Sequence, residues 1–248
     1  MPSSADENAA KAAREFAYKL VPRWRAQLGA QLLGTYLLGS LAHGGFSRRY
    51  SDIDMGAVTE SGLAPSALEA MRAEAVDVSA ELAPKLSIFW TDRSFSQGRF
   101  PPLDRSDFLD HAVTLCERER VSPPRPGLDE VRAYLTGLPF SNWVAAVERF
   151  CNADSLDPKD RKPYLRAQLY PARFAMSFMT GRMASNDDAV AWVRGQSFPG
   201  LDVPLIERAL DIRRAAADPD PLFPDRGKLR RQVAACQSLA MECAAEEP

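Results

Sequence analysis

The sequence predicts an α+β protein, with a small mixed β-sheet domain flanked by helices, followed by an all-α helical-bundle domain. Short apolar segments typical of strands alternate with helical segments up to about residue 116, and only helical periodicity follows. A proline-rich segment, residues 122–127, separates the two patterns. We therefore expect domains at residues 1–122 and 128–248.

Each element of the first domain follows from a local pattern. A helix is expected over residues 9–30, because apolar residues recur at every fourth position: Ala12, Phe16, Leu20, Trp24 and Leu28. Pro65 begins a second helix that runs to about Leu82, and a short third helix is expected over 104–110. The apolar segments between them predict strands at 32–38, 53–58, 86–91 and 112–116.

The second domain is expected to be a bundle because its apolar residues repeat at alternating spacings of four and three. One such stripe is formed by Leu165, Leu169, Ala172, Met176 and Met179, and another by Leu229, Val233, Cys236, Ala240 and Cys243. Stripes of this kind are the buried faces of amphipathic helices.

Composition narrows the class of protein. The chain has 248 residues, a formal net charge of −2 and a pI of about 5.8. A protein that binds a nucleic-acid backbone normally has a basic excess, so we expect a small acceptor and no nucleic-acid partner. No apolar run is long enough for a membrane span, and the first residues lack a signal-peptide pattern. Four cysteines without a Cys-x-x-Cys motif fit a reducing compartment, and we expect a cytoplasmic protein.

Most of the chemistry indicated by the sequence lies in residues 38–55. Gly39 and Ser40 end an apolar run, and Asp52 and Asp54 follow after eleven intervening residues. On a strand, side chains at i and i+2 point to the same face, so the two carboxylates would lie side by side. Paired carboxylates repel each other unless a cation or a proton lies between them. Mg²⁺ is the natural partner, because it takes one or two carboxylates and completes its shell with water and substrate phosphates.

The Gly-Ser pair supplies a second half of this predicted site. Ser40 fits the N-cap of a short helix that begins at Leu41, and amides at a helix start attract phosphate oxygens. Gly39 has no Cβ, which lets a phosphate approach the backbone closely. We expect this turn to hold a nucleotide phosphate tail while the next strand holds its metal ion.

This segment resembles the nucleotidyltransferase signature of the DNA polymerase β superfamily, an apolar-Gly-(Gly/Ser) turn followed about ten residues later by Asp-apolar-(Asp/Glu)-apolar. Residues 173–192, from Arg173 to Trp192, look like part of the helical domain of the streptomycin/spectinomycin adenylyltransferases. The resemblance implies transfer of AMP from ATP to a hydroxyl of an aminoglycoside-like acceptor, with Mg²⁺ on Asp52 and Asp54. It also implies that Arg173 contacts the triphosphate.

The chain departs from that family at two positions. The adenylyltransferases carry a glutamate early in the third strand as general base, and the matching residue here is Ser87. Asp92, at the end of the same strand, is a candidate substitute, with a turn or cap residue as the alternative. Asn186 stands where the family has a lysine that contacts the triphosphate. Arg48 and Arg49, in the loop before Asp52, are further candidates for phosphate binding, and Arg49 is the one we include in the predicted site.

The leading hypothesis is therefore a metal-dependent nucleotidyltransferase that uses ATP and a small hydroxylated acceptor. One alternative is a weakly active or non-catalytic relative that binds a nucleotide as a sensor or acts as an antitoxin-like partner. Another keeps the chemistry and modifies a protein or a tRNA, although the pI disfavours tRNA. The acidic residues of the short third helix, Asp104, Asp107 and Asp110, are expected to form a solvated helix face, with an acidic wall of the site as the alternative.

Overall fold

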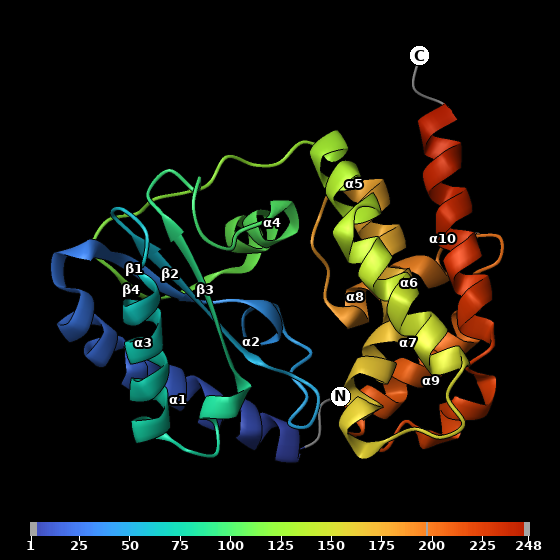
Figure 1. Ribbon diagram of the computed structural model, residues 1–248, viewed down its shortest axis with the longest axis horizontal. Coiled ribbons are helices and arrows are strands. Elements are labelled where there is room, and N and C mark those ends of the chain that lie inside the picture. Colours follow the sequence, from blue (N-terminus) through green and yellow to red (C-terminus); the bar gives the residue numbers. More distant parts are fainter. Residues whose placement is uncertain (1–3, 197, 246–248) are drawn as a thin grey trace. The chain divides into compact units, whose positions relative to one another are not determined.

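The computed structural model describes residues 4–196 and 198–245, and the chain divides into two compact units, Met1–Arg125 and Pro126–Pro248. The division falls inside the proline-rich segment at 122–127. Figure 1 shows strands in the first unit, while the regular elements described in the second unit are all helical. The predicted α+β fold class, a small mixed sheet followed by helices, is confirmed.

The first unit is built on a four-stranded mixed sheet with the strand order β3-β2-β1-β4. Its strands are β1 (Leu32–Leu37), β2 (Ile53–Thr59), β3 (Leu86–Asp92) and β4 (Val113–Glu117). β1 is antiparallel to both β2 and β4, and β2 is parallel to β3. Every residue of β1 is buried, as its nearly continuous apolar sequence requires for a central strand.

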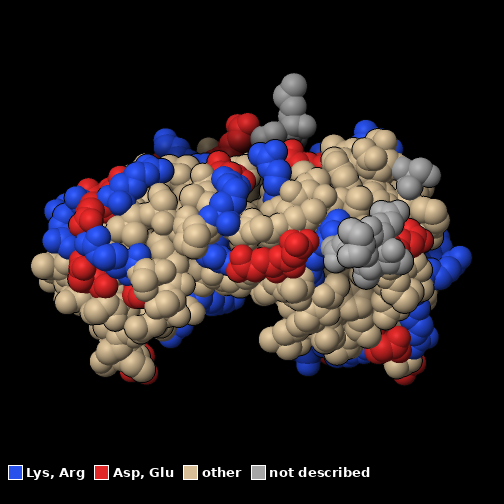
Figure 2. Space-filling model, turned by 90° about the horizontal axis from the view of Figure 1, so that it is seen from above, with Lys and Arg blue, Asp and Glu red and all other residues tan. Residues whose placement is uncertain are grey.

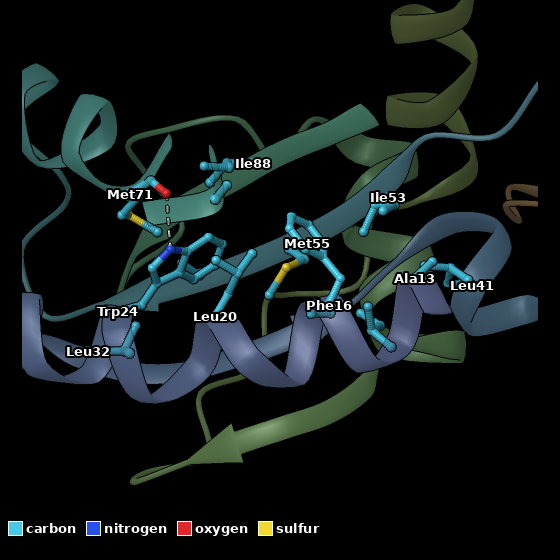
Figure 3. Packing of buried hydrophobic residues seen from close by; sticks show 14 residues of the cluster. Ala13, Phe16, Leu20, Trp24, Leu32, Leu41, Ile53, Met55, Met71 and Ile88 are labelled. Carbon is cyan, nitrogen blue, oxygen red and sulfur yellow. Dashed lines mark hydrogen bonds between the residues drawn. The ribbon is translucent and has the colours of Figure 1, made fainter. Parts of the chain in front are cut away.

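Helices cover both faces of this sheet (Figure 1). α1 (Ser4–Leu28) and α3 (Pro65–Val78) pack on one face, where Trp24, Met55 and Met71 belong to the main apolar cluster. The indole Nε1–H of Trp24 donates a hydrogen bond to the carbonyl oxygen of Met71, which joins the two helices (Figure 3). α4 (Pro102–His111) lies on the opposite face and buries Phe108 against Val58.

The second unit contains six α-helices in its described part. They are α5 (Leu128–Thr136), α6 (Leu138–Cys151), α7 (Arg161–Thr180), α8 (Asn186–Arg194), α9 (Val203–Arg214) and α10 (Lys228–Ala245). α7 is the central helix, because it packs against the other five. It ends where Gly181 adopts a left-handed conformation, φ +68°, that suits glycine.

Short 3₁₀ segments complete the chain: η1 (Gly29–Gln31), η2 (Ala83–Lys85), η3 (Pro158–Asp160) and η4 (Asp220–Asp225). Among the described residues, none of the helices is both long and apolar enough to cross a membrane. On the face drawn in Figure 2, basic and acidic side chains are mingled.

Candidate active site

The Gly-Ser pair starts a short helix directly after β1. This helix, α2, spans Gly39–His43, and its N-cap residue is Leu38, whose side chain makes no capping hydrogen bond. Ser40 is therefore the second residue of the helix and not its N-cap, which corrects the sequence-based expectation. The cap comes from elsewhere in the chain, because Asp107 Oδ2 accepts a hydrogen bond from the Gly39 amide at 3.0 Å.

The turn lies directly against Asp54. The Leu38 amide donates to the Asp54 carbonyl oxygen at 2.9 Å, continuing the pairing of β1 with β2. A Cβ built on Gly39 would lie less than 3.0 Å from Asp54 Oδ2, and Gly39 has φ +57°. Glycine is required at position 39 for two reasons. A side chain would collide with the Asp54 carboxylate, and the backbone adopts a left-handed conformation that suits glycine.

Strand alternation separates the carboxylates from the core. Ile53 and Met55 have no exposed surface and point into the cluster shared with α1 and α3 (Figure 3). Asp54 therefore points to the opposite face of the sheet, and alternation places Asp52 with it. Both aspartates are half-buried, so ligands can reach them.

This donor set fits a magnesium ion that shares its shell with a substrate. Among the described residues no group of three or more His, Cys, Asp or Glu side chains forms a cage that would hold an ion by itself. Two carboxylates leave the remaining coordination positions to water and phosphate oxygens, which is how Mg²⁺ is commonly bound with nucleotides.

Ser51 ties the aspartates to the Gly-Ser turn. Its hydroxyl oxygen accepts a hydrogen bond from the Ser47 amide at 2.9 Å and lies 3.0 Å from the Ser40 hydroxyl, which donates to it. The Arg48 amide donates to Asp6 Oδ1 at 3.0 Å, so α1 holds the same loop from the other side. The loop between the two halves of the motif is thus fixed by side chains from three places in the chain.

The two arginines of this loop are exposed. The guanidinium carbon of Arg49 lies 5.4 Å from the ring centroid of Tyr50, and the carbonyl oxygen of Arg48 accepts a hydrogen bond from Lys85 Nζ. Arg49 thus lies exposed on the short segment that leads into Asp52. A phosphate contact by Arg49 remains a prediction.

Ser87 occupies the position beside Asp54. In the parallel pairing of β2 with β3, Asp54 is opposite Ser87, and paired residues present their side chains to the same face of a sheet. Ser87 is half-buried, like Asp54. The strand register thus places a hydroxyl, and not a carboxylate, next to the aspartate pair.

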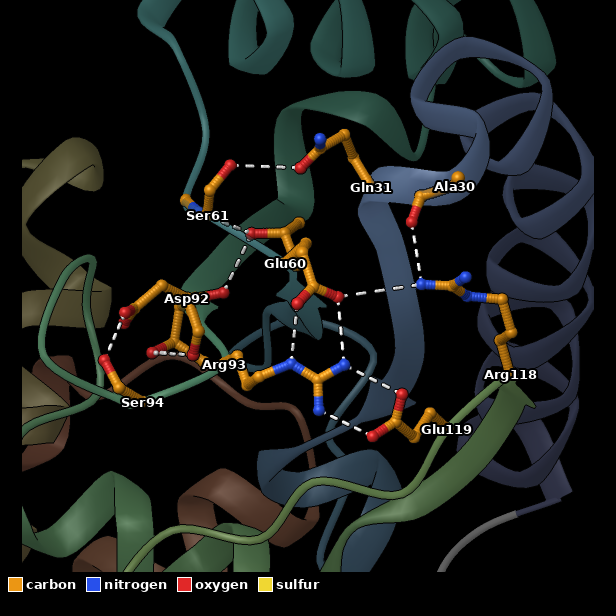
Figure 4. A network of polar contacts seen from close by, with 12 residues as sticks. Ala30, Gln31, Glu60, Ser61, Asp92, Arg93, Ser94, Arg118 and Glu119 are labelled. Carbon is orange, nitrogen blue, oxygen red and sulfur yellow. Dashed lines mark hydrogen bonds and ion pairs between the residues drawn. The ribbon is translucent and has the colours of Figure 1, made fainter.

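Asp92 lies at the other end of the same two strands. It is opposite Thr59, five residues beyond the Asp54–Ser87 pair, which corresponds to about 16 Å along a strand. Its Oδ1 accepts hydrogen bonds from the amides of Ser96 and Gln97, at 2.8 and 2.9 Å, and its Oδ2 accepts one from the Ser94 hydroxyl (Figure 4). The structure does not bring Asp92 to the aspartate pair, and the interpretation as a turn residue agrees with the geometry.

These hydrogen bonds also decide the charge state of Asp92. Burial by itself raises the pKa of the carboxyl, but the hydrogen bonds from Ser94, Gln97 and Ser96 together outweigh it and lower the pKa to about 2. Next to this turn, Arg93 forms ion pairs with Glu60 and Glu119 (Figure 4). The side chains at this end of the sheet therefore form a network of hydrogen bonds and ion pairs with a structural role.

Arg173 belongs to the second unit. It lies on α7, is half-buried, and its Nη2 approaches the Met183 sulfur at 3.3 Å. Asn186 is the first residue of α8, whose N-cap Ser185 accepts a hydrogen bond from the Asp188 amide at 3.0 Å. The phosphate contact that the family resemblance implies for Arg173 stays a prediction.

Asp107, like Ser40, is a residue that sequence reasoning placed wrongly. The expected solvated helix face would leave it exposed, yet it is 4% exposed. The spacing of acidic residues in α4 gave no sign of this, because burial depends on the contact of α4 with α2, which is distant in sequence.

Comparisons with known proteins support the fold. No protein-family model matches the sequence, and no curated protein matches it significantly. The architecture is nevertheless a small mixed sheet with flanking helices, followed by a helical unit. Among solved structures, the chain is similar to spectinomycin adenyltransferase AAD(9) from Enterococcus faecialis, solved with ATP and spectinomycin. The TM-score is 0.67 at 13% sequence identity, covering 90% of this chain and 99% of the other. The likeness in fold that the sequence resemblance implied is confirmed.

Gly39→Ala tests the packing of the turn against Asp54. We expect this variant to lower the free energy of unfolding by about 3 kcal/mol, since overlap with the carboxylate adds to backbone strain. Gly29→Ala is the matched control, because Gly29 has φ +53° and no atom within 4 Å of its added Cβ. It should lose only about 1 kcal/mol. Urea unfolding of both variants provides the measurement, and equal losses would contradict the packing.

Asp92→Asn tests the structural interpretation of Asp92. A carboxyl with a lowered pKa stabilises the fold while it is ionised, and this stabilisation is lost as the pH falls towards the folded-state pKa. The variant should therefore be less stable than wild type by roughly 2 kcal/mol at pH 7, and the difference should shrink between about pH 4 and pH 2. Unfolding measured over that pH range provides the check, and a difference that is constant with pH would be evidence against it.

Proposed function

We propose that this chain transfers the AMP group of ATP to a hydroxyl of a small acceptor. The observation that carries the proposal is the packing of Gly39 on the Asp54 carboxylate. This contact brings the Gly-Ser turn, the proposed phosphate-binding element, next to the pair of aspartates. The likeness in fold to an adenyltransferase supports it.

The residues of the first unit have separate roles in this proposal. Asp52 and Asp54 would hold Mg²⁺, which when bound neutralises phosphate charge and orients the triphosphate. Arg49 would offer a guanidinium to phosphate oxygens. The Ser40 hydroxyl donates to Ser51 here and would have to rotate away from it to donate to a phosphate oxygen. Gly39 was expected to let a phosphate approach the backbone closely, but its amide donates to Asp107 and the Asp54 carboxylate fills the space of its missing side chain, so its role here is to let the turn and Asp54 approach each other. Arg173 is assigned to the triphosphate by the family resemblance alone.

The reaction is an in-line displacement at phosphorus. The acceptor hydroxyl oxygen forms a bond to the α-phosphorus, and the bond from that phosphorus to the bridging α–β oxygen breaks. Pyrophosphate leaves with the bond's electron pair, and the hydroxyl proton passes to a base or to solvent. Catalysis of this kind depends mainly on positioning and on charge neutralisation.

The acceptor is proposed to be an aminoglycoside-like compound. The structural neighbour was solved with ATP and spectinomycin, a nucleotide together with a small hydroxylated ligand. A net charge of −2 also suits a cationic acceptor. Incubation with α-labelled ATP and Mg²⁺ against a panel of aminoglycosides tests this proposal, with spectinomycin included. Label appearing on a hydroxyl of one compound would support it, and label on protein or tRNA instead would assign another acceptor.

Calorimetry of ATP binding tests the carboxylate pair. Asp52→Asn and Asp54→Asn should each remove the part of the ATP affinity that depends on Mg²⁺, because each variant loses one of the two proposed ligands. Asp77→Asn, an exposed aspartate on α3, is the matched control and should bind like wild type. The assignment fails if EDTA has no effect on wild-type affinity, or if both site variants respond to Mg²⁺ normally.

Ser87 favours a second candidate function. A hydroxyl cannot accept a proton at neutral pH as a carboxylate does. The family resemblance implies a carboxylate base at the position of Ser87, which pairs with Asp54. A weakly active or non-catalytic relative, acting as a nucleotide sensor or antitoxin-like partner, would bind Mg²⁺ and ATP without rapid transfer. The two candidates differ in turnover and share the binding site.

Ser87→Glu separates these candidates. If the base is missing, restoring a carboxylate beside Asp54 should raise the transfer rate, by as much as about 10²-fold, and weaken its dependence on pH. Ser87→Gln introduces a side chain of the same shape as glutamate that cannot act as a base, so it should show no such gain. A rapid wild-type rate that Ser87→Glu does not increase would show that another group, or the acceptor itself, takes the proton.

A further inference from the structure

Asp107 is a buried carboxylate on the same face of the sheet as the aspartate pair. It lies on α4, whose Phe108 packs against Val58 of β2. Asp54 alternates with Ile53 and Met55 and therefore shares the face of Val58, and Ser87 shares it through the strand register. α4 thus covers the side of the sheet from which Asp54 and Ser87 project.

The two oxygens of Asp107 have different surroundings. Oδ2 accepts the hydrogen bond from the Gly39 amide at 3.0 Å. Oδ1 is buried and has no hydrogen-bond partner within the described part of the chain. A buried acceptor without a donor costs free energy, and such groups in native proteins usually have a functional or solvent partner.

Asp107 is also close to Asp54. Both carboxylates adjoin the same residue, because Asp107 bonds the Gly39 amide and Asp54 occupies the place of a Gly39 side chain. The bond lengths of one residue then limit the distance between the two Oδ2 atoms to about 8 Å. At this separation a negative charge still attracts a cation appreciably inside a protein.

We propose that Asp107 is a positioning residue of the metal site and its third carboxylate. Through Oδ2 it holds Gly39 against Asp54, and through Oδ1 it accepts a hydrogen bond from a water molecule of the ion's hydration shell. It thereby supplies a further negative charge and an orienting acceptor beside Asp54, on the side of the turn that follows β1. This inference rests on the proposed function, because it assumes that Asp52 and Asp54 bind the ion.

A plain helix cap is the competing explanation. As a cap alone, Asp107 would matter only as an acceptor for the Gly39 amide, and its loss would lower stability without a specific effect on metal binding. Asparagine separates the two roles, because its amide oxygen can still accept that hydrogen bond while the charge is lost.

The experiment is a Mn²⁺ titration followed by electron paramagnetic resonance, on the full chain with a non-hydrolysable ATP analogue. Asp107→Asn should weaken Mn²⁺ binding roughly tenfold, and Asp107→Ala should weaken it at least as much. Asp110→Asn is the matched control on the same helix, since Asp110 forms an ion pair with Arg125, and its Mn²⁺ affinity should stay within about twofold of wild type.

The outcomes distinguish this inference from the proposed function. Wild-type Mn²⁺ affinity in a folded Asp107→Asn would overturn the inference and leave Asp107 as a helix cap. A wild-type chain that binds no Mn²⁺ with the analogue would overturn the proposed function as well. Should Asp107→Asn not fold, the titration of Asp107→Ala decides, with the same expected loss.

Discussion

The site depends on one contact, in which the Asp54 carboxylate fills the space that a side chain on Gly39 would need. This contact fixes the distance between the turn after β1 and the start of β2. Because β1 and β2 are adjacent antiparallel strands, the turn and the aspartates lie at the same end of the sheet despite eleven intervening residues. A glycine with φ +57° is what makes the approach sterically allowed.

The surrounding hydrogen bonds hold this contact in place before any ligand arrives. Ser51 connects to both Ser40 and Ser47, and Asp6 on α1 binds the Arg48 amide. Asp107 reaches Gly39 from α4, which lies on the face of the sheet opposite to α1. Preorganisation of this kind lowers the cost of ordering the site when a ligand binds. It also gives Ser51, directly before Asp52, a structural role.

Much of the fold could be predicted from the sequence, because periodicity reports local structure directly. The four strands and the helices at Pro65 and near residue 104 were found within a few residues of their observed bounds. Strand register could not be predicted in the same way, because the pairing of Asp54 with Ser87 joins two strands that are distant in the sequence. Asp92 is only five residues from Ser87 in the chain, yet along an extended strand that separation removes it from the aspartate pair.

The parts of the site that sequence reasoning missed involve contacts between distant segments. Ser40 has the composition of an N-cap, but the backbone begins the helix one residue earlier and Asp107 supplies the cap. Asp107 itself belongs to an acidic helix whose spacing predicts exposure, and the contact of α4 with α2 buries it. Local patterns carry no information about such pairings, which arise from tertiary structure.

The central claim is that the Gly-Ser turn and the two aspartates form one metal-binding site. Its most direct test replaces Mg²⁺ with Fe²⁺ in the presence of an ATP analogue, adds ascorbate and peroxide, and maps the resulting backbone cleavage by mass spectrometry. The account predicts cleavage around residues 38–41, 51–55 and 107, and its loss in Asp54→Asn. Cleavage confined to other segments, or unchanged in Asp54→Asn, would contradict it.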